Sequence, residues 1–318
     1  MLDGDSDNAN FKEIAMIADV SVVIPSHNCL DYLPYALASV WAQSLEVREV
    51  WVVDDGSDDG TWDWLQQQRL QHPRLKTLRL DGVGCSAARN AAIKLCTSRW
   101  IAFLDADDSW AQDKIARQIK ASHHHPDAVL LFSNYQHFDE AGNAIISCFD
   151  YWSLPKEDND LLMFSSPQIM AQNLIGTSSV MAKREALLEH GGFNESLRSA
   201  SDWDLWLKLS YSGLCIGDQK ELMNYLMRSG SMTRARLKRL QAMETIVRQH
   251  QRHFSAAQWA LRWAKARIAE GYGEWHNENR QFVKACQAQL TALWLKPSWW
   301  SLKTLLGYCK RGSHGMFG

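Results

Sequence analysis

The sequence predicts an α/β protein built on a mostly parallel sheet with helices on both faces. Short β-branched and apolar runs alternate with segments whose apolar residues recur at helical spacing, a pattern typical of parallel strands joined by helical crossovers. Three of these strands run directly into polar clusters, at Asn28, Asp55 and Asp105. Because such crossovers are right-handed, the clusters are expected at one edge of the sheet, where α/β proteins bind ligands.

The first third of the chain supplies four predicted strands and three predicted helices. Each strand is a short apolar run, rich in β-branched residues or bounded by turn residues such as Pro25. The four runs are 20–24, 47–53, 75–80 and 100–104. Helices are predicted from apolar spacing at Leu33, Leu37, Val40 and Trp41, and over 62–70 and 86–95.

The next part of the chain is less regular. Further strands are expected at 128–132 and 175–181. A helix beginning at Asp202, with this residue in the N-cap position, is predicted by the spacing of Leu205, Trp206 and Leu209. Residues 139–166 combine glycine, proline and a polar run, and are expected to form an irregular, mobile loop over the site.

Length and charge divide the chain into three regions. At 318 residues it has room for one large domain and an appendage. The net charge of -2 hides an asymmetry, because residues 234–318 carry 15 Lys and Arg against four Glu and no Asp. We expect a polar tail over 1–18, an α/β domain over 19–234, and a basic, tryptophan-rich helical region over 235–318.

Cysteine usage and hydropathy bear on the compartment. The seven cysteines are scattered and include no CxxC pair, which favours reduced thiols over a disulfide framework or a zinc site. No basic start followed by an apolar core marks a signal peptide, and no apolar run approaches the roughly 20 residues of a membrane span. We expect a cytoplasmic protein, with peripheral attachment to the inner face of the membrane as the alternative.

The fourth predicted strand ends in three carboxylates within four residues, Asp105, Asp107 and Asp108. Like charges this close resist joint ionisation. A divalent cation held by oxygen ligands and shared with the phosphates of a ligand is a common way to neutralise them. The alternative is a solvated acidic turn, or a helix cap supplied by Asp108 or Ser109. The cluster alone leaves both interpretations open.

Other polar groups at the same edge also have two interpretations. The acidic run from Asp55 partly fits a calcium loop, but Gln66 stands where that loop has Glu, so an Asx turn fits better. Arg89, on the first turn of a predicted helix, either points into the crevice or pairs with the acidic edge at the surface. Asp202 is a functional carboxylate, a helix cap worth about 1 kcal/mol, or both.

Five ordered pieces together resemble the inverting glycosyltransferases of family 2, whose GT-A fold is a Rossmann-like sheet. The pieces are VVIPSHN (22–28), VDDGS (53–57), GCSAARN (84–90), LDADD (104–108) and SDWDLW (201–206). Each is short, so the specific signal is their order and spacing over roughly residues 19–234. The resemblance implies a nucleotide-diphosphate sugar donor (UDP-sugar favoured), a glycan or lipid-linked acceptor hydroxyl, and a divalent cation, Mn²⁺ or Mg²⁺. It also implies a place in polysaccharide, lipopolysaccharide or other glycoconjugate assembly.

The resemblance further implies roles by position. Donor binding would fall to Pro25, His27, Asn28, Asp55, Arg89, Asp105 and Asp107, the first two and Asp55 being at the nucleobase. Asp105 and Asp107 match the DxD element, which reaches the ribose and the metal, and Asp108 is expected to share the metal. Asp202 matches the general base, and Arg228 or Arg234 the basic residue that closes on the diphosphate. His27 replaces the usual Tyr or Phe, which leaves the nucleobase open, and Ser201 replaces a Glu.

Residues 235–318 are predicted to form three or four helices rich in Trp, Leu and Ala, with a break at Pro297. One interpretation is an appendage that packs its aromatic face on the rest of the protein. The other is that basic residues and exposed tryptophans hold the enzyme at an anionic membrane surface, where lipid-linked acceptors reside. Nucleic-acid binding is not expected, because no recognised module accompanies the basic segment.

Two other functional classes compete with a glycosyltransferase. A sugar-phosphate nucleotidyltransferase would need a glycine-rich phosphate loop with a basic residue directly after the first strand, and residues 26–30 lack it. A non-catalytic protein that binds nucleotide sugar or acts as a scaffold is disfavoured by the intact Asp55, Asp105, Asp107 and Asp202.

Overall fold

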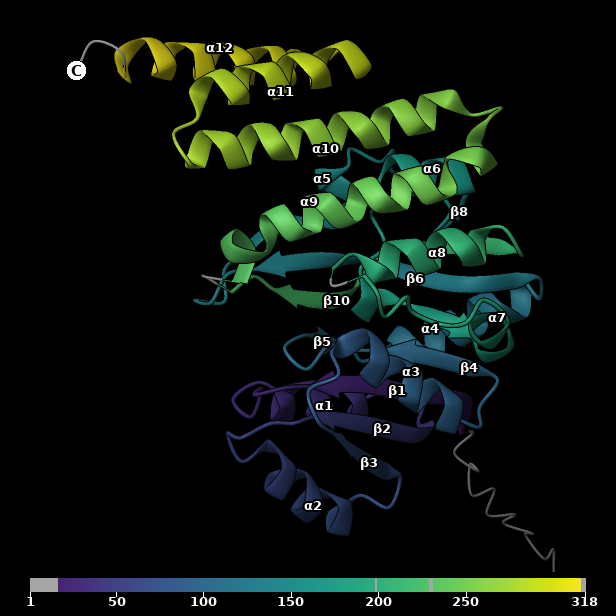
Figure 1. The fold of residues 1–318 in the computed structure, drawn as a ribbon. Coiled ribbons are helices and arrows are strands. Elements are labelled where there is room, and N and C mark those ends of the chain that lie inside the picture. Colours follow the sequence, from purple (N-terminus) through teal and green to yellow (C-terminus); the bar gives the residue numbers. More distant parts are fainter. Residues whose placement is uncertain (1–16, 198, 229–230, 316–318) are drawn as a thin grey trace, which may run out of the picture.

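The computed structural model describes residues 17–197, 199–228 and 231–315, and the side chains of 231–235 and 313–315 lie outside this description. Almost all of the predicted tail over 1–18 also lies outside the described residues. The centre is a ten-stranded sheet whose main path has the order β3-β2-β1-β4-β9-β6-β10-β5. Figure 1 shows β1 to β3 at one end of the molecule and the C-terminal helices stacked at the other. The predicted α/β class is confirmed.

The N-terminal half of the sheet follows the predicted strands closely. Its four strands are parallel, with β1 lying between β2 and β4. They are β1 (Ala18–Ser26), β2 (Val47–Asp55), β3 (Leu75–Leu80) and β4 (Trp100–Phe103). The connecting helices are α1 (Leu33–Trp41), α2 (Thr61–Gln71) and α3 (Cys85–Leu95).

Helices cover both faces of this sheet because successive strand residues point to opposite sides. Val22 of β1 belongs to one buried core together with Leu37 of α1. Its neighbour Val23 belongs to a second core together with Ala92 of α3. The near-continuous apolar strands predicted from the sequence are therefore buried on both faces, as parallel strands usually are.

The C-terminal half of the sheet is longer than predicted and partly antiparallel. β6 (Ala128–Phe138) runs parallel to β10 (Leu214–Leu226), and β9 (Met181–Lys183) lies antiparallel between β4 and β6. The remaining elements here are β5 (Ser109–Trp110), α4 (Lys114–His124), α6 (Ser166–Ala171), α7 (Arg184–Glu189) and α8 (Ser201–Ser210).

The strand predicted over 175–181 is wrong for most of its length. Thr177–Ser179 form a 3-10 turn, η1, and only Met181 joins the sheet. Hydroxyl groups compete with a strand here: Ser179 Oγ donates to the Gly176 carbonyl at 2.7 Å, a local bond that favours turns over extended chain.

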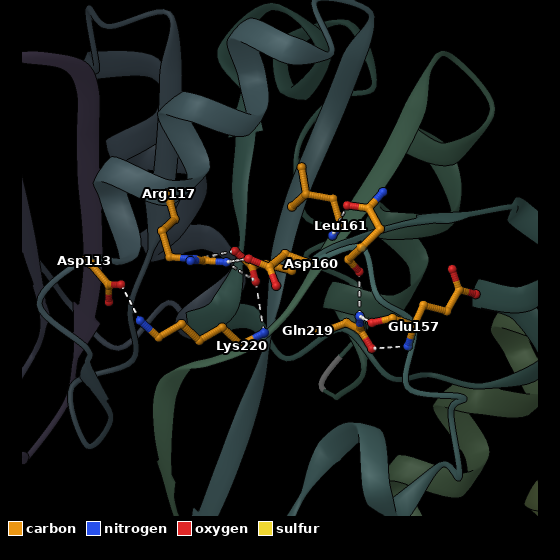
Figure 2. A network of polar contacts seen from close by, with 9 residues as sticks. Asp113, Arg117, Glu157, Asp160, Leu161, Gln219 and Lys220 are labelled. Atoms are coloured by element: carbon orange, nitrogen blue, oxygen red, sulfur yellow. Dashed lines mark hydrogen bonds and ion pairs between the residues drawn. The ribbon is translucent and has the colours of Figure 1, made fainter.

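The irregular, mobile loop expected over 139–166 is also wrong. This stretch holds β7 (Ala144–Ser147), α5 (Cys148–Tyr151) and β8 (Leu161–Phe164). The polar run before β8 is fastened to β10, since Gln219 Nε2 donates to the carbonyl of Asn159 at 2.6 Å (Figure 2). The composition of this stretch is typical of a loop. The contacts that order it come from a residue about 60 positions away in sequence, so local composition could not reveal them.

Arg117 of α4 joins the polar run to the sheet. Its Nε and Nη2 donate to the carboxylate of Asp218 at 2.7 and 3.0 Å, and Nη2 also donates to Asp160 at 2.9 Å (Figure 2). Asp218 is only 3% exposed, so its charge depends on this guanidinium. Lys220 makes a more open ion pair, 2.5 Å from Asp113.

Four long helices follow β10: α9 (Ser231–His250), α10 (Gln258–Glu278), α11 (Phe282–Leu295) and α12 (Trp299–Gly315), with a 3-10 turn over Gln251–Phe254. Ile246 of α9 and Ala264 of α10 share the core that covers one face of the sheet. Over 17–197, 199–228 and 231–315, no helix is both long and apolar enough to cross a membrane. The division between residues 234 and 235 stays a prediction.

A buried histidine ties α9 to α8. His250 Nε2 lies 2.8 Å from Asp204 Oδ1, and His250 Nδ1 lies 2.8 Å from the Tyr211 hydroxyl. Burial by itself would raise the pKa of Asp204, but hydrogen bonds from His250 and Lys208 lower it. Asp202 and Asp204 are two residues apart and lie on nearly opposite sides of α8. The helix is therefore braced by α9 on the side away from Asp202.

Replacing Arg117 with Met should lower the free energy of unfolding by about 2–4 kcal/mol, because buried Asp218 would lose its cationic partner and keep the main-chain N–H of Lys220. Denaturant unfolding measures this loss. Lys220→Met is the matched control, since breaking its exposed pair should cost at most about 1 kcal/mol. Equal losses in the two variants would contradict this account of the network.

Candidate functional site

The candidate site lies where β1, β2 and β4 end. The register pairs Ser26 with Asp54 and Val23 with Phe103, so the loops that follow the three strands begin side by side. The polar clusters predicted to share one edge of the sheet do so. Hydrogen bonds and ion pairs then connect these loops to α3, η1 and α8.

At one end of the site, three residues hold the strand-end loops together. Asp55 is 6% exposed, and its two oxygens accept from the main-chain N–H groups of Val83 and Gly84, each at 2.7 Å. His27 is exposed, with Nδ1 2.8 Å from the Asp55 carbonyl. Asn28 has a positive φ of 51°, which Asn tolerates better than most residues.

The polar groups of Asn28 bond to the neighbouring turn. Its main-chain N–H donates to Ser57 Oγ at 3.0 Å, and its Oδ1 accepts from the Asp58 N–H at 2.9 Å. Pro25 is buried at the end of β1. The structure therefore places Pro25, His27, Asn28 and Asp55 together.

Arg89 lies inside the site, not at the surface. It is 6% exposed, its guanidinium stacks 5.2 Å from the Phe193 ring, and Nη2 donates to Asp105 Oδ1. Burial alone would lower the pKa of Arg89, but the charges of Asp105 and Asp202 help to raise it. Arg89 therefore pairs with the acidic edge, as one interpretation held, but as a buried side chain and not at the surface; its place in a ligand crevice stays a prediction.

The three carboxylates after β4 have different partners. Asp105 meets Arg89, Asp107 meets Arg228 Nη2, and Asp108 is 5% exposed and accepts from Ser178 Oγ at 2.5 Å. Burial, with the charges of Asp105 and Asp107, raises the pKa of Asp108 well above its usual value. The interpretation as a solvated acidic turn is wrong. Asp108 faces inward and fastens the loop, and its share in metal binding stays a prediction.

Ser178 in η1 organises this loop. Its Oγ accepts from the Asp105 N–H at 2.9 Å while donating to Asp108, and its carbonyl accepts from Trp110 Nε1 at 2.7 Å. Sequence reasoning missed Ser178. The only signal was the Thr-Ser-Ser run, which we interpreted as part of a strand.

Asp202 approaches from the opposite side of the site. It is the second residue of α8, and the N-cap is Ala200 with a φ of 55°, so the predicted N-cap position is wrong by two residues. Its Oδ2 accepts from Thr177 Oγ1 at 3.3 Å and its Oδ1 from the Trp203 N–H at 2.8 Å. Burial raises the pKa of Asp202, although the Trp203 N–H and the charge of Arg89 oppose the rise.

The first turns of α3 and α8 meet beside Arg89. Ser86 Oγ and Ser201 Oγ lie 2.9 Å apart, and the N-cap of α3 is Gly84. Unpaired N–H groups make a helix N-terminus favourable for anions. Two such termini and a buried arginine therefore lie between Asp105 and Asp202.

Arg228 borders the site on its other side. Its guanidinium lies 5.0 Å from the Tyr32 ring and pairs with Asp107. The side chain of Arg234, the other predicted candidate, lies outside the described residues. A surface cavity of about 310 Å³ opens here, with Tyr32, Tyr35, Tyr225 and Asp107 in its walls.

Comparisons with known proteins decide the family. A protein-family model described as "Glycosyl transferase family 2" matches residues 21–168. The putative teichuronic acid biosynthesis glycosyltransferase TuaG of Bacillus subtilis (strain 168) is 30% identical over 246 residues, which cover 76% of this chain and 92% of TuaG. The chain belongs to glycosyltransferase family 2. It is therefore an enzyme of the glycosyltransferase class, which sets aside the nucleotidyltransferase and scaffold alternatives.

Other relatives of this glycosyltransferase differ in length. Chondroitin synthase of Escherichia coli is 28% identical over 207 residues, 65% of this chain but only 28% of that protein. The UDP-Glc:alpha-D-GlcNAc-diphosphoundecaprenol beta-1,3-glucosyltransferase WfaP of Escherichia coli is 27% identical over 199 residues, 61% of this chain and 71% of WfaP.

Solved structures support the GT-A fold of this glycosyltransferase. S. aureus TarS 1-349 in complex with UDP-GlcNAc aligns with a TM-score of 0.60 at 16% identity, covering 92% of this chain and 91% of that chain. The mannosyltransferase PcManGT from Pyrobaculum calidifontis, in complex with GDP-Man and Mn²⁺, aligns with a TM-score of 0.64 at 18% identity, covering 93% and 84%.

The carboxylates of this glycosyltransferase fit a divalent cation that is shared with a diphosphate. Burial and the charge of Asp105 raise the pKa of Asp107, so a nearby cation would favour its ionised form. Among the residues that the structure describes, no three His, Cys, Asp or Glu side chains are grouped to hold an ion alone. Mg²⁺ characteristically binds one or two carboxylates, substrate phosphates and water, which matches this small ligand set.

Ser178→Ala should lower the unfolding free energy of this glycosyltransferase by about 1–3 kcal/mol, because buried Asp108 would lose its hydroxyl donor. Urea unfolding measures the loss, and nucleotide affinity should weaken with it as the DxD loop loosens. Ser179→Ala is the control, since it removes an equally buried hydroxyl that bonds only within η1. A Ser179 variant that weakens nucleotide binding as much would argue against the role of Ser178.

Proposed function

We propose that this glycosyltransferase moves a sugar from a nucleotide-diphosphate donor, with UDP-sugar favoured, to an acceptor hydroxyl with inversion at the anomeric carbon. The observation that carries the proposal is the convergence of carboxylates from separate segments around buried Arg89. Asp105 and Asp107 follow β4, whereas Asp202 comes from α8, about 100 residues later. A single displacement needs a leaving group and a base on opposite sides of the reacting carbon, and two separate segments can supply them.

The nucleotide would bind along the ends of β1 and β2. His27 is exposed and offers a surface for the base, and buried Pro25 would shape the pocket beside it. Asp55 already accepts two N–H groups, so its remaining lone pairs are available to a base donor. Asp105 and Arg89 would meet the ribose and diphosphate. Asn28, which bonds to the neighbouring turn, would shape the loop and contribute less to direct contact.

Negative charge develops on the diphosphate as the anomeric bond breaks. Arg228 can approach it, since its guanidinium is already beside Asp107, and the N-termini of α3 and α8 favour anions. A Mn²⁺ or Mg²⁺ ion at Asp107, with Asp105 and Asp108 near it, would stabilise the same charge as a Lewis acid. These groups are fixed before the reaction, which is how preorganised sites lower a barrier.

Asp202 would accept the proton of the attacking hydroxyl. Its raised pKa favours proton transfer near neutral pH more than an ordinary aspartate would. Thr177 and the Trp203 N–H hold its two oxygens in place. Ser201, where the family often has Glu, bonds to Ser86. Of the two carboxylates in this turn, Asp204 pairs with His250 and Lys208, which leaves Asp202 as the one beside Arg89.

The acceptor is proposed to be a glycan or a lipid-linked glycan in polysaccharide, lipopolysaccharide or other glycoconjugate assembly. Support comes from the relatives, because WfaP is named for a diphosphoundecaprenol acceptor and TuaG for teichuronic acid biosynthesis. We also propose a cytoplasmic location, supported by the seven cysteines, which are all free thiols.

In a thermal-shift screen of UDP-, GDP- and TDP-sugars with Mn²⁺, one nucleotide class should raise the Tm of the protein, because a ligand that binds the folded state stabilises it.

Asp107→Ala should remove the Mn²⁺-dependent part of nucleotide-diphosphate binding, measured by calorimetry with and without the ion. Asp63→Ala removes an exposed carboxylate of α2 and should change nothing. A Mn²⁺-dependent affinity that survives in the Asp107 variant would remove Asp107 as the ion's ligand.

Asp202→Asn should keep donor binding and lower transfer by about 10²–10⁴-fold, the usual contribution of a general base. Because burial raises the pKa of Asp202, the ionised fraction falls as pH drops through a value above the ordinary aspartate pKa of about 4. The kcat/KM of the wild type should therefore fall with decreasing pH at a higher pH than an ordinary aspartate would give. The Asn variant should not show this decrease. Full turnover by the variant would exclude Asp202 as the base.

A further inference from the structure

The turn between α11 and α12 exposes three tryptophans. Trp294 lies at the end of α11, and Trp299 and Trp300 begin α12. Their exposed fractions are 74%, 79% and 54%. Only residues 296–298 separate the two helices, so the three indole rings lie around one bend. We call residues 294–303 the tryptophan turn.

Exposed apolar residues extend from the tryptophan turn along both helices. Val283, Leu290 and Trp294 are spaced seven and four apart and share one face of α11, each more than half exposed. On α12, Trp299, Lys303 and Leu306 are spaced four and three apart and also share a face. Contiguous apolar surface of this kind usually marks an interaction site.

The outward faces of α11 and α12 are not part of the protein's core. Ala285 and Ala292 of α11 and Tyr308 of α12 are buried on the inner sides of their helices. The core shared with the sheet includes residues of α9 and α10 but, among the described side chains, none of α11 or α12. Figure 1 shows these two helices as the outermost layer, at the end of the molecule away from β1 to β3.

Two of the tryptophans of α10 behave differently. Trp263 and Trp275 pack against the shared core, whereas Trp259, at the start of the helix, is 43% exposed. The predicted packing of an aromatic face on the rest of the protein is therefore confirmed for Trp263 and Trp275, whereas the tryptophan turn faces water.

Charge indicates which partner fits this surface. Residues 279–318 contain six Lys and Arg and no Asp or Glu, and Lys284 and Lys303 are exposed on the same two helices. A bilayer with anionic headgroups offers phosphates to the cations and an apolar boundary to the indole rings, which favour the headgroup level. A symmetric dimer formed through this face would place the positive charges of the two copies against each other.

We propose that the tryptophan turn and the outward faces of α11 and α12 dock on an anionic membrane surface. The helices would lie in the interface without crossing the bilayer, as amphipathic helices with basic and aromatic residues do. Docking through this surface leaves the strand-end site uncovered, because none of its residues belongs to α11 or α12. The proposal does not depend on which sugar is transferred, or on whether Asp202 is the base.

Vesicle flotation with the full chain tests the proposal. The protein should float with vesicles of phosphatidylcholine and phosphatidylglycerol at low salt, and its binding should weaken at least about tenfold with phosphatidylcholine alone or in high salt. Trp299→Ala with Trp300→Ala, and separately Lys284→Glu with Lys303→Glu, should each weaken binding by roughly tenfold or more.

Matched controls lie on α2 and α4, outside the proposed docking surface. Leu70→Ala removes an exposed apolar side chain of α2 and Lys120→Glu reverses an exposed charge of α4, and neither should alter flotation. Thermal unfolding and transfer to a water-soluble acceptor should be unchanged in all variants, which separates docking from folding and catalysis.

Four outcomes would overturn the proposal. The first two are that the protein does not float with vesicles, or that it binds the two vesicle types equally. The third is that the tryptophan and lysine variants float as well as the wild type. The fourth is that these variants abolish self-association or duplex DNA binding while vesicle binding persists.

Discussion

The site depends on one electrostatic constraint: three carboxylates lie within four residues at the end of β4, where burial raises the pKa of Asp107 and Asp108. Each is met by a partner from a different segment. Asp105 pairs with Arg89 of α3, Asp107 with Arg228 after β10, and Asp108 with a serine of η1. The need to neutralise this cluster therefore brings distant parts of the chain to one place.

The sequence predicted the strands that are buried on both faces and the polar residues at their ends. Val20 to Ile24 and Trp100 to Phe103 are short, apolar and bounded by turns, so local pattern determines them. Ser178 was not predictable in the same way, because its importance comes from bonds to residues about 70 positions earlier. The structured polar run before β8 was missed for the same reason, since its partners are on β10.

Asp202 illustrates a different limit of sequence reasoning. Its presence at a helix start was predictable from the spacing of the apolar residues that follow, yet the helix begins one residue earlier and is capped by Ala200. Asp202 bonds locally to the Trp203 N–H and also to Thr177, 25 residues earlier, and its pKa is raised by burial beneath other segments. The residue type was visible in the sequence, but its protonation behaviour depends on tertiary packing.

The His250 contact has a consequence for how this enzyme can be recombined with its relatives. Asp204 stands two residues from Asp202, and its buried carboxylate bonds to Lys208 of the same helix and to a histidine that belongs to the first of the C-terminal helices. Exchanging those helices between homologues would remove one of these two partners, so the buried carboxylate would be only partly satisfied unless the incoming segment carries an equivalent donor. Chimeras that aim to swap acceptor preference should therefore keep residues 204 and 250 from the same parent.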